Sequence, residues 1–302
     1  MVYLISIKLR EDYSNLIFYL SPLVAVVLTL FFGSFIFLIL DLSPIESFKI
    51  FFISPISNSY GISELFVKAT PLAIIALGLS YCFKNNIYNI GADGQLTMGA
   101  IFGGGIGLLF NESTSIFLLP LMILFGAIGG AFWATIPALL KTKFNTNEIL
   151  TSLMLTYVAL FILDYFVVGP WKDPAGYGLP KSMPFPDAGR LPVLFDGLRI
   201  HIGVYFAIII CFISSIVYNK TLFGFKLRVS GFSSKASQYA GFKYKNLIFY
   251  TFIISGACAG LAGLFEVSGP IGLLYRDISP NYGFTAIIVC LLYTSPSPRD
   301  PT

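Results

Sequence analysis

Long apolar stretches with few or no charges most constrain what this chain can fold into. The first, residues 16–40, holds 25 residues without one charged side chain. A helix of roughly 17–25 mainly apolar residues crosses the hydrocarbon core of a bilayer. The sequence therefore predicts an all-α, polytopic membrane bundle, with spanning helices at about residues 16–40, 65–83, 96–110, 116–140, 149–168, 200–218 and 247–265, and an eighth beginning near Tyr282.

Composition excludes a water-soluble protein and gives little basis for an enzyme. Hydrophobic residues make up 56% of the chain and charged residues only 11%, whereas soluble domains carry about 25% charged residues. The four cysteines lie far apart, and His201 is the only histidine. A catalytic triad or a histidine metal site would have to be built around that one residue. We therefore expect no catalytic residue, no metal and no cofactor in this chain.

The third apolar stretch, residues 96–110, is short and unusually rich in glycine. It holds 15 residues, five of which are glycine. Short hydrophobic segments interrupted by glycine are where transporters line a solute pathway. We predict a broken or partly inserted, discontinuous helix here.

The distribution of Lys and Arg predicts the orientation in the membrane. With the N-terminus in the cytoplasm, most basic residues fall in inner loops, including residues 219–246, which hold six Lys or Arg and no acid. Cytoplasmic loops carry this excess of positive charge. The proline-rich residues 169–199 then form an extended outer loop. This orientation requires residues 96–110 to cross the membrane fully.

A polar stretch, "NIGADGQ" at residues 89–95, interrupts the apolar sequence. Asp93 is placed to cap a helix that starts at Gly94, because its carboxylate would accept from the first free backbone N–H groups. Asn89 and Gln95 would satisfy other backbone groups or contact a solute. Two interpretations stay open: a capped helix start at the membrane surface, or the lining or gate of a pathway. The residues alone favour the first.

Two carboxylates lie near the outer ends of predicted spans. Asp164 lies in the outer part of the fifth span, and Glu266 at the outer end of the seventh. A charge within a span is costly and usually faces a cavity or a partner. An interfacial carboxylate that reaches water is the equally weighted alternative for both.

Other local patterns predict helix starts and helix contacts. Asn145 and Glu148 have the spacing of a capping box, so we predict that together they begin the fifth span. Glycines four residues apart permit close approach of two helices, within or between subunits. Two such pairs occur: Gly126 with Gly130, and Gly256 with Gly260.

The basic inner loop is predicted to contain a short helix. Ser233 would cap it over residues 235–240, and Gly241 would end it in a left-handed conformation. Ala236 and Ala240 would share one face of this helix. Exposed aromatic residues beside it are typical anchors of a protein–protein contact. The alternative is a basic loop held near lipid headgroups by its charge alone.

Several blocks of the sequence resemble one transporter family. The stretch "NIGADGQ" is similar to the "NIGAEGQ" signature of permease subunits of ABC importers for simple sugars and nucleosides, within the branched-chain amino acid and ribose permease family. Asp93 stands where that family usually has Glu. The chain departs from the family pattern in two ways. The family has an acidic residue followed by two alanines in the inner loop, where this chain has Lys235, Ala236 and Ser237, and the C-terminal spans of the family are absent. The resemblance continues in residues 146–174, 221–242, 255–269 and 279–289.

The resemblance implies a function and a set of partners. It implies a multi-pass permease of the bacterial plasma membrane that moves a nucleoside or simple sugar, a small-molecule solute. Its partners would be a second permease subunit (identical or homologous), a cytoplasmic ABC ATPase that binds the ATP, and an extracytoplasmic solute-binding protein. No nucleic acid partner is implied. The chain itself has no phosphate-binding G-x-x-x-x-G-K-[ST] run.

The residue patterns, together with the resemblance, assign roles to particular residues. The translocation path or gate is assigned to Asn89, Asp93, Gln95 and Asp164. Coupling to the ATPase is assigned within residues 221–242 to Gly224, Arg228, Gly231, Ala236, Tyr239, Ala240, Gly241 and Phe242. Helix packing is assigned to Gly126, Gly130, Gly256 and Gly260.

Two other classes of function fit the sequence less well. A secondary transporter or channel for a small polar solute would need ionisable residues deep in its spans, and apart from Asp164 near one end the spans hold almost none. A membrane-embedded enzyme lacks a catalytic cluster.

The end of the sequence departs from a membrane protein pattern. The eighth apolar stretch gives way to "TSPSPRDPT" after about a dozen residues, which as a helix would extend only about 18 Å. The run "CLLYTSPSPRD" is similar to the translation of a sequencing adapter. We therefore expect a permease domain over residues 1–289, a non-native tail over residues 290–302, and further spans that this chain lacks.

Overall fold

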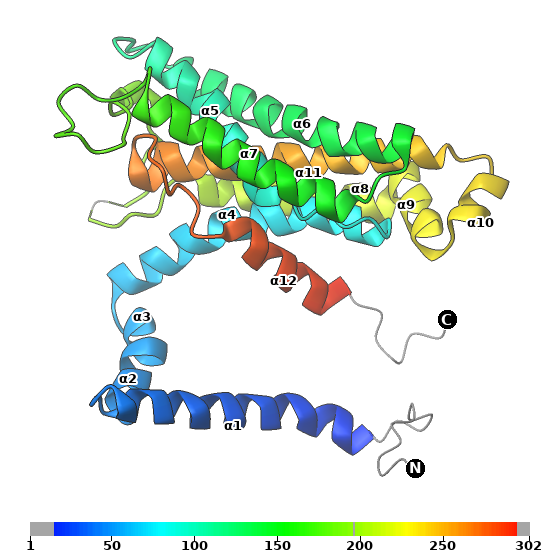
Figure 1. The fold of residues 1–302 in the computed structure, drawn as a ribbon, viewed down its shortest axis with the longest axis horizontal. Coiled ribbons are helices and arrows are strands. Elements are labelled where there is room, and N and C mark those ends of the chain that lie inside the picture. Colours follow the sequence, from blue (N-terminus) through cyan, green and yellow to red (C-terminus); the bar gives the residue numbers. More distant parts are fainter. Residues whose placement is uncertain (1–14, 196, 295–302) are drawn as a thin grey trace, which may run out of the picture. The chain divides into compact units, whose positions relative to one another are not determined.

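The computed structural model describes residues 15–195 and 197–294 (Figure 1). Over these residues the regular structure is helical, accompanied by three isolated β-bridges. The predicted all-α bundle is therefore confirmed. The elements are α1 Asn15–Ile39, α2 Pro44–Phe48, η1 Lys49–Ile53, α3 Ser54–Ser57, α4 Ser59–Lys84, α5 Ala92–Leu109, α6 Leu118–Phe144, α7 Glu148–Val168, η2 Asp187–Gly189, α8 Gly203–Lys220, α9 Leu222–Phe232, α10 Ser234–Tyr239, α11 Tyr244–Glu266, η3 Val267–Ile271 and α12 Tyr282–Thr294.

Each predicted span corresponds to a helix, although α4 begins at Ser59, well before the predicted residue 65. α5, which corresponds to the predicted third span, is not one of the helices long and apolar enough to cross a membrane. Among the described residues, six helices are long and apolar enough to cross a membrane: α1, α4, α6, α7, α8, and α11 with its extension η3. α12 is shorter and apolar from Tyr282 to Leu291. Residues 295–302, the greater part of the tail expected to be non-native, lie outside the described residues.

The chain divides into two compact units, residues 1–62 and residues 63–302. The described part of the first unit holds α1, α2, η1, α3 and the start of α4. α1 presents nearly all of its large apolar side chains at the surface of the chain, including Phe31 and Ile39, each 66% exposed. Such a helix is stable only where lipid or another protein covers those side chains.

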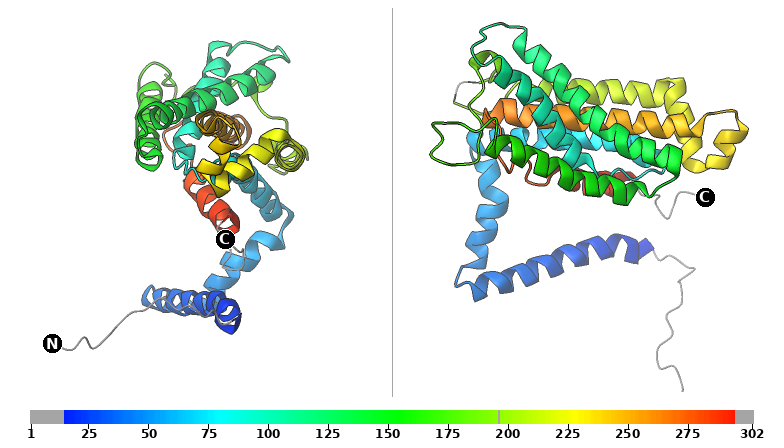
Figure 2. Two further views of the ribbon diagram at one scale, coloured as in Figure 1. Left: turned by 90° about the vertical axis from the view of Figure 1, so that its right-hand side faces the viewer. Right: turned by 45° about the horizontal axis from the view of Figure 1, so that its top comes forward.

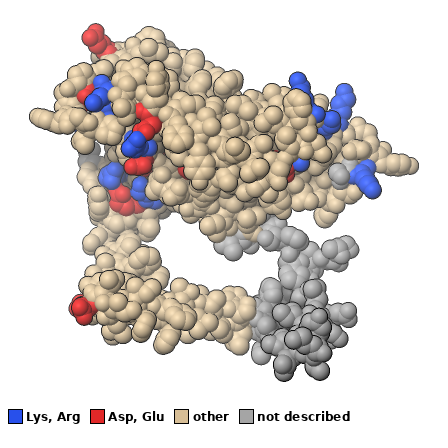
Figure 3. Space-filling view, in the orientation of Figure 1, with Lys and Arg blue, Asp and Glu red and all other residues tan. Residues whose placement is uncertain are grey.

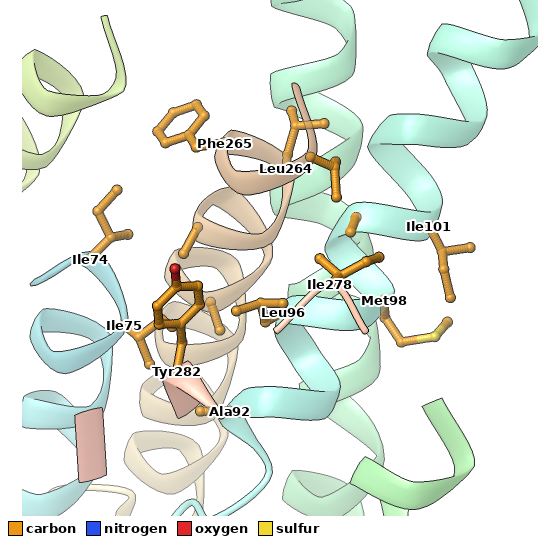
Figure 4. Packing of buried hydrophobic residues seen from close by; sticks show 14 of the residues in the cluster. Ile74, Ile75, Ala92, Leu96, Met98, Ile101, Leu264, Phe265, Ile278 and Tyr282 are labelled. Atoms are coloured by element: carbon orange, nitrogen blue, oxygen red, sulfur yellow. The ribbon is translucent and has the colours of Figure 1, made fainter. Parts of the chain in front are cut away.

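The second unit is a bundle in which α11 is the central helix. α6 and α5 make the most extensive contacts with α11, and α7 packs on α5 (Figures 1 and 2). Buried side chains from α4, α5, α11 and α12 point toward one another in this core. Figure 4 shows Tyr282 of α12 among Ile75 of α4, Ala92 of α5 and their neighbours.

Glycines let the backbones of α5, α6 and α11 touch. A Cβ atom on Gly130 would lie 2.2 Å from the carbonyl oxygen of Gly256 and 2.6 Å from the Cα atom of Gly260. A Cβ atom on Gly99 would lie 2.2 Å from that same Cα atom. A Cβ atom on Gly126 would lie 2.9 Å from the Leu264 Cβ atom, and a Cβ atom on Gly260 would lie 2.3 Å from the Gly126 carbonyl oxygen. Both predicted glycine pairs thus lie at one helix crossing within the subunit.

The glycines of α5 do not break it. α5 is one continuous helix of 18 residues, so the predicted discontinuity is not within the helix. Instead, α5 follows residues 85–91, which are non-helical although several of their side chains are buried. Such backbone at this depth is tolerated where protein surrounds it.

The long loop between α7 and α8 is folded onto one end of the bundle. The amides of Ser182, Phe185 and Leu191 donate to carbonyl groups of the chain after α11, at 2.8, 2.8 and 2.9 Å. Phe185 is buried, and Trp171 stacks on Phe166 with ring centroids 4.3 Å apart. The loop consists of turns, isolated β-bridges and the short helix η2 joined by irregular chain, and these contacts fix it in place.

Candidate functional site

The polar stretch at residues 89–95 begins where the chain turns back into the bundle after α4. Asn86 adopts a left-handed conformation with φ of 59°, and the amides of Asn86 and Ile87 donate to carbonyls of the last turn of α4. Asparagine tolerates this conformation better than other non-glycine residues. The turn directs the next residues inward along α11.

Asn89 and Gln95 form a reciprocal amide pair in the interior. Asn89 Nδ2 donates to Gln95 Oε1 at 2.9 Å, and Gln95 Nε2 donates back to Asn89 Oδ1 at 3.1 Å. Asn89 also donates to Ser255 Oγ at 3.0 Å and accepts from the Gly91 amide. Both side chains are buried. Their hydrogen bonds offset the cost of burying amides, which is large when they are unpaired.

Asp93 joins α5 to the first turn of α12. Its Oδ1 atom accepts from Ser279 Oγ at 2.6 Å and from the Gly283 amide at 3.0 Å. A Cβ atom on Gly283 would lie 2.4 Å from the Asp93 amide nitrogen, so only glycine permits this approach. The prediction that Asp93 caps its own helix is wrong: α5 begins at Ala92, and its N-cap Gly91 has no side-chain cap.

We call residues 89–95 together with Ser152, Ser255 and Ser279 the polar joint. Ser152 of α7 accepts from the Ile90 amide at 3.2 Å, so the joint ties four helices together. Ser255 is eleven residues from Tyr244 and eleven from Glu266, the two ends of α11. At 1.5 Å per residue the joint therefore lies about 16 Å from either end of α11. The interpretation as a helix start at the membrane surface is thus wrong.

Asp164 is not part of the polar joint. It lies eight residues beyond Thr156, where α7 contacts Gly94, which is about 12 Å along the helix. Its carboxylate accepts two hydrogen bonds from Arg276, which is 59% exposed. Asp164 therefore has a charged partner, which is the first of its two predicted alternatives. Sequence reasoning missed that partner because 112 residues separate the two.

Glu266 lies deeper in the bundle than Asp164. It is 2% exposed and accepts from Lys68 Nζ at 3.4 Å and from the Tyr282 hydroxyl at 3.2 Å. Its Oε2 atom has no hydrogen-bond partner among the described residues. Glu266 therefore does not reach water as an interfacial carboxylate would.

The short helix predicted in the basic loop is confirmed. α10 spans Ser234–Tyr239, and Ser233 Oγ accepts from the Ala236 amide at 3.2 Å. Gly241 follows with φ of 78°. Tyr239 is 98% exposed, and Ala236 is exposed with it. This helix presents a small, partly aromatic surface.

Phe242 and the glycines of α9 lie in contacts within the chain instead. The Phe242 ring packs against Phe225, with centroids 6.3 Å apart, and under the Lys226 ammonium. A Cβ atom on Gly224 would lie 2.1 Å from the Tyr218 carbonyl oxygen. Only part of the predicted coupling set therefore lies at the surface: Ala236, Tyr239, Ala240 and Gly241.

α9 is fastened to the end of α4 that leads into the polar joint. A Cβ atom on Gly231 would lie 2.0 Å from the Lys84 carbonyl oxygen, and Ser230 donates to the Asn85 side chain. Arg228 donates to the Tyr218 carbonyl at 2.7 Å. Only three residues lie between Asn85 and Asn89. Sequence reasoning missed Ser230 and Asn85, because neither stands in a local motif.

The capping box predicted at Asn145 and Glu148 is wrong. Asn147 is the N-cap of α7 and accepts from the Ile149 amide at 3.0 Å. Asn145 ends α6 in a left-handed conformation. Glu148 pairs with Lys141 at 2.8 Å. The turn between the helices is so short that one Asn ends the first and the next begins the second.

Charge differs between the two ends of the second unit. The end with α9 and α10 shows Lys and Arg with little acid beside them, whereas the opposite end shows both signs together (Figure 3). Three ion pairs lie at the mixed end: Lys68–Glu266, Arg199–Glu64 and Arg276–Asp164. No group of three potential metal ligands occurs among the described residues.

His201 precedes α8 and is held neutral. Its Nδ1 atom accepts from the Gly203 amide at 3.2 Å, and the residue is 2% exposed. Burial first, and then the positive charge of Arg199, lower the pKa of His201 to about 4.

Comparisons with known proteins point to a single family. The model of the branched-chain amino acid transport system permease component matches residues 61–293. The chain is 34% identical to the glucose ABC transporter permease protein TsgB13 of Haloferax volcanii, over 91% of this chain and 74% of that protein. It is 31% identical to the guanosine ABC transporter permease protein NupP of Bacillus subtilis, over 90% of this chain and 79% of that protein. The nucleoside ABC transporter permease protein NupB of Lactococcus lactis is 29% identical over 90% of this chain and 77% of its own. No solved structure matches at a significant level.

Proposed function

The chain belongs to the family of branched-chain amino acid transport permease components, and on that premise we propose that it forms the translocation path for a nucleoside or a simple sugar. It is a multi-pass membrane protein and a permease subunit of an ABC importer. Its relatives are transport permeases rather than enzymes. The solute class rests on the relatives, whose names specify glucose, guanosine and nucleosides.

The observation that carries a transport role is the polar joint. Backbone that is not helical enters the middle of an apolar bundle there, with two amides and a carboxylate beside it. In this conformation Asn89 bonds to Gln95 and to Ser255. Asp93 bonds to Ser279 and to the Gly283 amide, so the joint is closed. We assign it the role of a gate that opens when α5 and α12 separate. Asp164 then lies nearer the outer mouth of the path.

We assign the end with α9 and α10 to the cytoplasm of a bacterial plasma membrane, because cytoplasmic loops carry excess Lys and Arg. The N-terminus is then cytoplasmic too. A cytoplasmic ABC ATPase docks on α10 and binds the ATP. α9 passes its motion to Asn85 through Ser230, and from there to the joint. A second permease subunit completes the membrane part.

The opposite end receives the solute-binding protein. The loop between α7 and α8 is already fixed against residues 268–274 by backbone hydrogen bonds. An ordered surface loses less conformational entropy when a partner binds it.

A matched pair of variants tests the docking of the ATPase. Tyr239→Glu places a charge on α10, and Tyr177→Glu places one on an equally exposed tyrosine, 99% exposed, in the loop at the opposite end. We expect Tyr239→Glu to abolish co-purification of the ATPase with the full chain, and Tyr177→Glu to leave it unchanged. Equal retention by both variants would place the ATPase contact elsewhere.

A secondary transporter is the second candidate, and two buried carboxylates favour it. Asp93 and Glu266 are each at most 3% exposed, and buried carboxylates are typical of proton-coupled transport. Uptake of labelled nucleoside or sugar into proteoliposomes distinguishes the two functions. We expect uptake to require the ATPase and ATP, and to continue when the proton gradient is collapsed.

A further inference from the structure

A groove opens between the end of α6 and the start of α11, away from the polar joint. Its volume is about 580 Å³, and its lining includes Lys143, Lys245, Asn246, Leu139 and Tyr250. Lys143 lies in the last turn of α6 and Lys245 in the first turn of α11. Both helices are long and apolar enough to span the membrane. The groove is therefore at the level where the hydrocarbon core meets the headgroups.

The two lysines of the groove have no acidic partner among the described residues. The four ion pairs found among those residues all involve other cations. One of these cations is the nearby Lys141, which pairs with Glu148 at 2.8 Å. Lys143 and Lys245 are exposed and come from different helices. The groove thus gathers two unpaired positive charges, with the amide of Asn246 beside them as a further donor.

The groove continues onto an apolar surface. Leu139 is 41% exposed and Tyr250 is 51% exposed. Tyr250 meets Phe249 edge to face, with ring centroids 6.2 Å apart. Tyrosine is enriched where headgroups meet acyl chains, because its ring is apolar and its hydroxyl is polar. A ligand that fits here is anionic at one end and apolar at the other.

We propose that this groove binds one anionic phospholipid. The headgroup phosphate lies between Lys143 and Lys245, and an acyl chain follows Leu139 and Tyr250. Basic pockets between spanning helices bind anionic lipid headgroups in this way. The lipid holds the end of α6 against the start of α11, directly after the loop that carries α10.

Native mass spectrometry of the purified full chain, titrated with phosphatidylglycerol in detergent, tests the proposal. Each lysine near an anionic lipid contributes a factor of about five in affinity, so Lys143→Gln with Lys245→Gln should weaken binding about thirtyfold. Lys220→Gln with Lys235→Gln removes the same charge from exposed lysines at the same end, outside the groove, and should change binding less than about twofold. Lys143→Arg with Lys245→Arg should retain it.

Each other outcome overturns the proposal. Equal losses in both double Gln variants would mean general attraction to a basic surface. Phosphatidylcholine bound as tightly as phosphatidylglycerol would mean an apolar groove without headgroup recognition. Displacement of the lipid by millimolar inorganic phosphate would mean a free-anion site. Lost co-purification of the ATPase with unchanged lipid binding would assign the groove to that protein. Size-exclusion chromatography checks that every variant is folded.

Discussion

Replacing Asp93 by Ala should lower the free energy of unfolding by about 2–4 kcal/mol. The carboxylate accepts from the Gly283 amide at 3.0 Å and from Ser279 Oγ at 2.6 Å. A buried donor left without an acceptor costs about 1–3 kcal/mol. Gly283 is fully buried and bears that cost, whereas Ser279 is only partly buried and bears a smaller share.

Two related variants separate the contributions. Asp93→Asn keeps one oxygen that accepts from Gly283 and should cost about 1 kcal/mol. Ser279→Ala removes the donor to Asp93 and also the acceptor of the Tyr282 amide, at 3.0 Å, and should cost about 1–2 kcal/mol. Because the two residues share one hydrogen bond, the double variant Asp93→Ala with Ser279→Ala should cost less than the sum of the single losses, by about 1 kcal/mol.

The assay is reversible unfolding of the purified full chain in mixed micelles, followed by circular dichroism, with solute uptake measured on the same variants. A loss below about 0.5 kcal/mol for Asp93→Ala, or strict additivity with Ser279→Ala, would refute the described link between α5 and α12. If uptake falls further than the folded fraction does, Asp93 also acts in the gate. If both fall together, its role is structural.

Three further outcomes follow from local geometry. Gly260→Ala should destabilise the bundle by about 1–3 kcal/mol, measured by the same unfolding assay, because its Cβ atom would lie 2.3 Å from the Gly126 carbonyl oxygen. Asn147→Ala should cost about 0.5–2 kcal/mol as a lost N-cap, while Asn145→Gly, which keeps the left-handed conformation that ends α6, should not remove a cap from α7; the reverse order of losses would restore the original capping box. Neutral His201 has its pKa lowered from 6.5 to about 4 by burial, so the unfolded chain binds more protons between those values. The contribution of neutral His201 to the free energy of unfolding should be fully present above pH 6.5 and should be lost, by about 3 kcal/mol, as the pH drops toward 4. If the thermal stability of His201→Gln falls equally over this pH range, the assignment is contradicted.

The helices were predictable because a membrane imposes a length on an apolar segment. The stretch predicted at residues 149–168 is α7, Glu148–Val168, and the stretch at residues 247–265 is α11, Tyr244–Glu266. The short helix in the basic loop was also predictable, because Ser233 and Gly241 are local start and stop signals. These features depend on residues only a few positions apart.

The polar joint could not be assembled from sequence alone. Aspartate is a typical helix-capping residue, but the Asp93 carboxylate accepts hydrogen bonds from Ser279 and Gly283, which are 186 and 190 residues away in the sequence. Nothing in the local pattern distinguishes a carboxylate that caps its own helix from one that holds another. The same holds for the glycine pairs: spacing predicts that Gly256 and Gly260 meet a backbone, but not that this backbone belongs to α6.

Contact between backbones also decides which parts of this permease can slide. Packed helices shift past one another by small movements of the side chains between them. At the crossing of Gly130 and Gly260 no side chain separates the two helices, and Gly99 brings α5 to the same place. We therefore expect α5, α6 and α11 to move as one solid block during transport. We expect displacement in α12, which separates from α5 at the gate, in α8, which buries only Gly203 and Ala207 along its length, and in the α9–α10 segment attached to α8.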